Sequence, residues 1–140
     1  MRFEQSIDID ASQQRVWDVL SDLQAWPRRI ETVEVVELLT PAPIGEGSRV
    51  RLRQPKLPEG VWEVTQWDAP SFFEWRQTSS GVTIVAGHRV EALEGNRSRL
   101  SLTLEMSGLL VPIVGRLSRD LTNRYMTLEA QGMKRAAEAT

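Results

Sequence analysis

The order of hydrophobic and polar positions divides the chain into segments with two different periods. In seven segments apolar and polar residues alternate with a period of two, which is typical of a strand with one buried face. The clearest case is the last one, where Leu100, Leu102 and Leu104 alternate with Ser101 and Thr103. Runs rich in turn-forming residues separate most of the segments. We therefore predict seven strands, at residues 2–9, 32–39, 48–54, 61–67, 71–78, 82–93 and 97–106.

A helical period appears directly after the first predicted strand. Val16 and Leu20 lie four residues apart on one helix face, and Asp10 or Ser12 is placed to cap the start of that helix. Asp22 is placed to open a second short helix, which we expect Pro27 to disturb. The pattern therefore predicts two short helices between the first and second strands.

The last quarter of the chain has the longest helical period. Apolar residues recur there at steps of three and four, at Leu110, Val114, Leu117, Leu121, Tyr125 and Leu128. We predict one helix over residues 113–138, about 39 Å long at the usual rise of 1.5 Å per residue. Its apolar stripe requires a surface to cover it, and the predicted sheet is the available one.

The order of these elements predicts an α+β domain. The short connections between the later strands favour an antiparallel meander over parallel strands joined by helices. A sheet that curves round the long terminal helix, with large side chains on its walls, would leave a cavity between the two. Ligand cavities of this kind measure about 300–1,000 Å³.

Composition narrows the classes of partner. The 140 residues fit one domain spanning residues 1–140, and the net charge of −2 comes from 17 basic and 19 acidic residues. Such a balance does not favour a nucleic-acid-binding protein. The sequence has no apolar run long enough for an integral membrane helix, and no signal peptide is apparent. We expect a cytoplasmic protein, and the sequence leaves a homodimer open.

Several segments together resemble a known superfamily. They are IDIDAS at 7–12, VWDVLSD at 16–22, WEVT at 62–65, FEW at 73–75 and HRV at 88–90. These segments are similar to the START-like (SRPBCC) superfamily, and the later ones resemble its bacterial polyketide cyclase/dehydrase branch. The resemblance implies the helix-grip fold, a seven-stranded antiparallel sheet wrapped around a long C-terminal helix, with two short helices after the first strand. Because this fold serves transporters, cyclases and receptors alike and carries no universal catalytic motif, no catalytic residue is implied.

Strand alternation suggests which side chains face the interior. The residues that we expect to contact a ligand are Trp62, Phe73, Trp75, His88, Leu104, Leu117, Leu121 and Tyr125. Each of the apolar members could equally be ordinary core. His88, the only histidine, is either a hydrogen-bonded core residue or a group on the cavity wall that exchanges a proton with a ligand. Gln54 and Tyr125 are the other candidates for orienting hydrogen bonds.

Three functions are consistent with this reading. The first is binding of a small hydrophobic ligand, lipid-like or polyketide-like, in the cavity. The second is a polyketide cyclase or dehydratase in which His88 shuttles a proton and Tyr125 polarises a carbonyl. The third is a protein-interaction module with a filled core.

Other chemistries find no support in the sequence. The chain has no cysteine and one histidine, so a thiolate or multi-histidine metal site cannot form. No nucleophile elbow and no dinucleotide-binding loop is present, and we expect neither a metal nor a cofactor.

Overall fold

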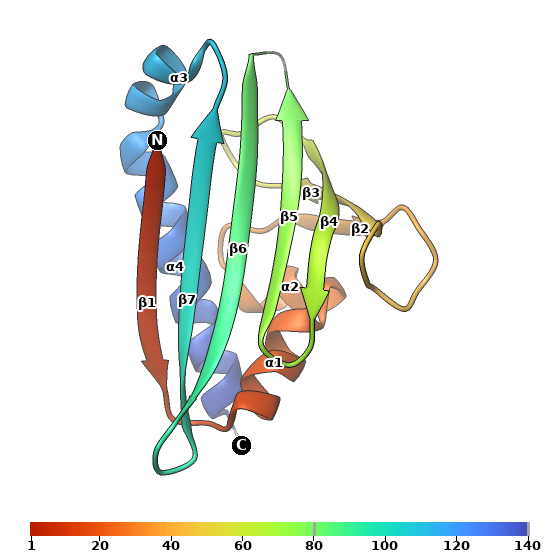
Figure 1. The fold of residues 1–140 in the computed structure, drawn as a ribbon, viewed down its shortest axis with the longest axis vertical. Coiled ribbons are helices and arrows are strands. Elements are labelled where there is room, and N and C mark those ends of the chain that lie inside the picture. The colour runs from red at the N-terminus through yellow and green to blue at the C-terminus, as the bar shows by residue number, and fades with distance from the viewer. Residues whose placement is uncertain (80, 140) are drawn as a thin grey trace.

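A single antiparallel sheet forms the main layer of the protein, in a computed structural model that describes residues 1–79 and 81–139 (Figure 1). Its strand order is β1-β7-β6-β5-β4-β3-β2. The strands are β1 (Arg2–Ile9), β2 (Val35–Leu38), β3 (Arg49–Arg53), β4 (Gly60–Asp68), β5 (Phe72–Ser79), β6 (Val82–Leu93) and β7 (Arg97–Ser107). The predicted seven-stranded antiparallel sheet is therefore confirmed, with β2 to β7 as a meander and β1 paired to β7. The expected turn between β5 and β6 includes Ser80, which lies outside the described residues.

The register of the central strands follows from their alternation. On β7, Leu100 pairs with Ile7 of β1 and with Val90 of β6, and Leu102 pairs with His88 of β6. Leu100 is completely buried. A shift of one residue would turn this whole apolar row to the solvent, so the pattern fixes the pairing.

Two short helical segments follow β1 and cover one end of the sheet. They are α1 (Gln13–Ser21) and, after the 3-10 turn η1 (Leu23–Ala25), α2 (Trp26–Arg29). The Ser12 hydroxyl caps α1 by accepting a hydrogen bond from the Arg15 N–H at 3.2 Å. The expectation that Pro27 would disturb the second short helix was wrong. Pro27 occupies the first turn of α2, where a missing N–H costs little.

The predicted long C-terminal helix is two helices. α3 (Val111–Leu117) and α4 (Arg119–Glu138) meet at Ser118. The break changes the direction of the apolar stripe, and Leu117 is 82% exposed. The face of α4 that is buried consists of Met126, Ala130, Gly132, Met133 and Ala137. The predicted inward face through Leu117, Leu121 and Leu128 was wrong.

Small residues dominate the buried face of α4 because this helix lies close to its neighbours. A side chain on Gly132 would collide with the backbone carbonyl of Arg29 at the end of α2. Large residues at such positions would hold the helices apart and open the core between them.

The helices leave part of the sheet uncovered. α4 lies behind β1 and β7 in Figure 1, while α1 and α2 lie at the lower end of the sheet. The strands on the other side, β3 to β5, curve past α4 without a helix over their upper part. The space between them and α4 is where the candidate site lies.

Leu100→Ala tests the register. Because Leu100 is fully buried between β1 and β6, we expect the free energy of unfolding to fall by about 2–5 kcal/mol, measured by urea denaturation. The matched control is Leu109→Ala at a residue that is 94% exposed, with an expected change within about 0.5 kcal/mol. Equal effects of the two changes would contradict the register.

Candidate ligand-binding cavity

A cavity of about 370 Å³ lies between the inner face of the sheet and the helices α3 and α4. Its walls are mostly apolar, and they include Leu52, Trp62, Trp75, Ala86, Leu102, Leu104 and Met126. The polar side chains that reach it include Gln54, Gln77, His88, Thr122, Tyr125 and Glu129. The polar groups of the helix side come from one face of α4 at steps of three and four residues.

Aromatic rings form one wall of the cavity and hold one another in place. The rings of Trp62 and Trp75 are 5.4 Å apart at 31°, and Trp26 meets Trp75 edge-on, also at 5.4 Å. The Trp26 indole N–H donates to the Leu20 carbonyl at 2.9 Å, which satisfies its one polar group. This wall is therefore anchored to α1 and α2.

His88 lies on β6 with its ring fixed on both sides. It stacks on Phe73 with centroids 4.0 Å apart and planes 10° apart, and Nδ1 lies 3.4 Å from the Phe73 carbonyl oxygen. Burial lowers the pKa of His88 to about 3, because the charged imidazolium would lose its hydration. The imidazole is therefore neutral at physiological pH.

Glu129 of α4 faces His88 across the base of the cavity. Its Oε2 lies 3.7 Å from the His88 Nε2, which is too long for a hydrogen bond. Burial raises the pKa of Glu129 to about 7, because an ionised carboxylate is poorly solvated there. Since desolvation disfavours both charges, the two groups are a neutral pair below about pH 7, with one exchangeable proton on the Glu129 carboxyl.

The predicted contact residues divide into two groups. Trp62, Trp75, His88, Leu104 and Tyr125 line the cavity, as does Gln54. The other three do not line it. Phe73 is fully buried behind the His88 ring, Leu117 points into solvent, and Leu121 lies at a separate surface hollow beside Arg124. Leu117 ends α3 before the break at Ser118, and Leu121 lies on α4 outside its buried face.

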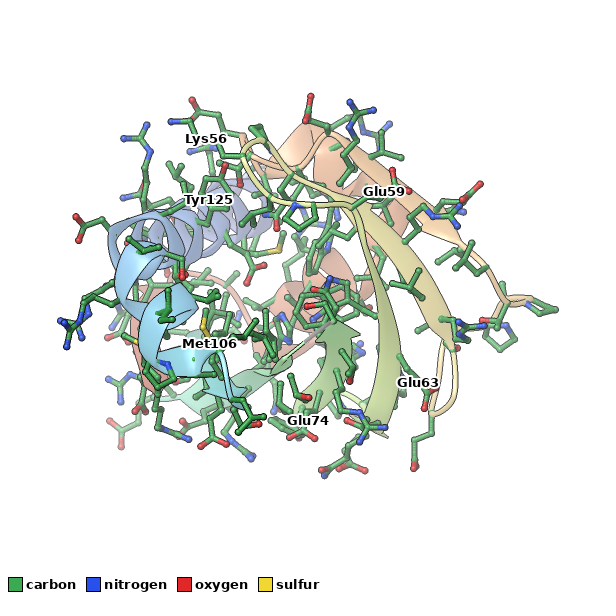
Figure 2. The ribbon with its side chains drawn as sticks, turned by 90° about the horizontal axis from the view of Figure 1, so that it is seen from above. Lys56, Glu59, Glu63, Glu74, Met106 and Tyr125 are labelled. Atoms are coloured by element: carbon green, nitrogen blue, oxygen red, sulfur yellow. The ribbon has the colours of Figure 1, made fainter. Side chains whose placement is uncertain are left out.

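Tyr125 lies at the rim of the cavity and joins α4 to the loop between β3 and β4. Its hydroxyl donates a hydrogen bond to the Pro55 carbonyl. Lys56 of the same loop lies beside it, whereas Glu63 and Glu74 point away on the outer face of the sheet (Figure 2). In this arrangement the hydroxyl closes the rim and is not free to polarise a ligand carbonyl.

Sequence comparison adds a family to this geometry. Residues 1–138 match the model of a family described as polyketide cyclase / dehydrase and lipid transport. The chain belongs to this family. No curated protein matches the sequence significantly.

Solved structures support the fold of this family member. The Zhui aromatase/cyclase from Streptomyces sp. R1128 has a TM-score of 0.80 at 20% identity over 99% of this chain and 93% of its own. A START superfamily protein from Mycobacterium smegmatis has a TM-score of 0.74 at 16% identity, covering 96% and 97%. A hypothetical protein from Helicobacter pylori reaches 0.84 at 12% identity, covering 99% and 88%. These likenesses confirm the helix-grip fold.

Sequence reasoning missed Glu129, because a glutamate on a helix is usually solvated. A signal was present: Glu129 follows Met126 by three residues and precedes Met133 by four, so it shares their face. The predicted face of the helix was different, and Glu129 was therefore not among the predicted site residues.

Two features that would point to other functions are not found among the described residues. No three histidine, aspartate or glutamate side chains gather there as a possible metal site. None of the helices has the length and the hydropathy needed to cross a bilayer.

The Glu129 and His88 pKa shifts act on stability with opposite signs. A glutamate that titrates near 4.5 when unfolded and about 7 when folded binds more protons in the folded state, so stability falls as the pH rises between these values. A histidine that titrates near 6.5 when unfolded and about 3 when folded does the reverse. Between about pH 4.5 and 6.5 the two contributions oppose each other.

Glu129→Gln removes only the contribution that falls with pH. We expect the variant to gain stability relative to the wild type, by about 1–3 kcal/mol in total, as the pH rises from about 4.5 to 7 in urea unfolding. Glu63→Gln, on the exposed outer face, is the control without this burial. A difference between Glu129→Gln and the wild type that does not vary with pH would show that the buried carboxyl ionises normally.

Proposed function

We propose that the protein binds a small hydrophobic ligand in the cavity between the sheet and α4. The observation that supports this most directly is the cavity of about 370 Å³ with an anchored wall of Trp62 and Trp75. Its volume lies within the range of known ligand sites, about 300–1,000 Å³. Transfer of apolar ligand surface into such a space contributes about 25 cal/mol per Å² buried.

The distribution of polar groups would orient the ligand. His88 and Glu129 lie at the base, while Gln54 and Tyr125 lie toward the β3–β4 loop. An elongated ligand with a polar group at one end would place that group between His88 and Glu129 and its apolar body against the tryptophans. Lipid-like and polyketide-like molecules both have this form.

The entrance is expected between α3 and the β3–β4 loop. Leu57 of the loop and Val114 of α3 both line the cavity and are 39% and 36% exposed. An apolar rim of this kind favours ligands that carry little charge over most of their surface. An interaction module with a filled core is not supported, because the interior is not filled.

A second proposal is an enzyme of the cyclase or dehydratase kind. The observation that favours it is the neutral His88 and Glu129 pair, since an acid with a pKa of about 7 suits general acid–base catalysis. In such an enzyme Glu129, and not His88, would exchange the proton, because His88 titrates far below neutrality. Tyr125 would have to release Pro55 before it could polarise a carbonyl.

Leu104→Trp tests the binding proposal by filling the cavity. We expect the affinity for a fluorescent probe with an aromatic body, such as anilinonaphthalene sulfonate, to fall by at least about tenfold, because the larger ring occupies the ligand volume. Leu39→Trp, at an exposed residue outside the cavity, is the matched control and should leave the affinity unchanged. Equal probe binding by both variants would place the probe elsewhere.

The enzyme proposal makes a separate prediction. With a poly-carbonyl substrate, Glu129→Gln should lower kcat by about 10²–10⁴-fold, and the wild-type rate should change with pH around about 7. His88→Ala should have the smaller effect on kcat. A larger loss in His88→Ala, with folding intact by circular dichroism, would return the proton transfer to His88.

A further inference from the structure

At the base of the cavity the His88 imidazole and the Glu129 carboxyl face one point. Because a carbonyl oxygen can only accept, the His88 Nδ1 must carry the proton in its contact with Phe73. In the neutral imidazole this leaves Nε2 as a bare acceptor, and Nε2 is the atom that faces the Glu129 carboxyl at 3.7 Å. Apart from the exchangeable proton of Glu129, no donor of the described residues makes a hydrogen bond to either group.

The cavity also supplies no positive charge for Glu129. Of the described side chains that line it, the titratable ones are His88 of β6, Tyr125 of α4 and Glu129 itself, and none is an arginine or lysine. A buried carboxylate without a cation is costly, which is why the unliganded protein retains the proton up to about pH 7. A ligand that brought both a donor and a positive charge would relieve both deficits.

We propose that the ligand is an apolar or aromatic molecule that carries a protonated amine, and that this amine binds between Glu129 and the His88 Nε2. The inference rests on the proposed binding function and names its ligand class. One ammonium nitrogen can reach both acceptors, since atoms 3.7 Å apart can each lie about 2.9 Å from a shared donor.

The surrounding rings fit a cation. Trp75 lines the cavity, and its ring centroid is 5.7 Å from that of His88, whereas Trp26 lies buried behind this wall. Indole faces attract cations when water is excluded. A ligand whose polar group is a carbonyl would instead place a third acceptor beside Nε2, with one proton on Glu129 to share among them.

The proposal requires Glu129 to lose its proton when the amine binds. Since Tyr125 is bonded to Pro55 at the rim and His88 is held neutral by its burial, Glu129 is the lining group that titrates between about pH 6 and 8. Binding of an amine at about pH 6 should therefore release nearly one proton per complex, and binding of a neutral ligand should release none.

The test uses four probes that share one aromatic body. They are naphthylethylamine, naphthylethanol, naphthylacetone and ethylnaphthalene, titrated by calorimetry into the wild type, Glu129→Gln and Leu104→Trp. At about pH 8 we expect the wild type to bind the amine at least about tenfold more tightly than the alcohol. In Glu129→Gln this preference should fall to about onefold. Proton release is measured on the wild type in buffers of different ionisation enthalpy. The conclusion about the Glu129 proton therefore holds even if a variant fails to fold.

The outcomes separate this inference from the function on which it rests. Similar affinities for all four probes, tightest binding of the ketone, or no proton release with the amine would overturn the amine proposal and leave cavity binding in place. If none of the probes binds the wild type at millimolar concentration, both proposals fail. Amine binding that survives in Leu104→Trp would place the amine outside the cavity and also overturn the inference.

Discussion

The width of the sheet relative to one helix determines most of this structure. Seven strands at about 4.8 Å spacing span about 29 Å, whereas a helix with its side chains is about 10–12 Å across. α4 therefore covers only the β1 and β7 side of the sheet (Figure 1). The aromatic residues and the short helices α1 and α2 fill one end of the remaining space. What they leave is the cavity, so a binding space is a direct consequence of how the sheet is covered.

The polar groups at the base of the cavity indicate a functional site, because apolar side chains would be expected in the same place. Glu129 and His88 lie where apolar side chains would stabilise the fold more, and neither gains a strong partner in the protein. Groups with pKa values shifted by burial are common at functional sites. The wall around them is rigid, because Phe73, Trp75 and Trp26 all contact the His88 ring. A ligand would therefore meet acceptors that are already in position.

The sheet was predictable from the sequence, and the helix side of the site was not. Alternation located every strand and placed Trp62, Trp75, His88 and Leu104 on the inner face. Each of these positions depends only on a period of two along a local segment. The neighbouring Phe73 showed the limit of that reasoning, since it is inward but hidden behind His88.

On the helix side, the break at Ser118 made the predicted buried face incorrect. The break at Ser118 rotates the stripe of α3 relative to that of α4, and a continuous helix drawn through Leu117 and Leu121 therefore selected the wrong face. The buried face of α4 contains small residues such as Ala130, which allow the helix to approach its neighbours closely but add little hydrophobic surface. Glu129 was not predicted as a site residue for the same reason, because its burial depends on where α4 lies in three dimensions.

The most direct test of ligand binding is native mass spectrometry of the protein as purified from its own source. The sample is then denatured, and any released molecule is identified. The account predicts a complex with one small molecule that has an apolar body and is lost on denaturation. The bare chain mass alone, even after incubation with a total metabolite and lipid extract of the source, would contradict the claim that this cavity is a binding site.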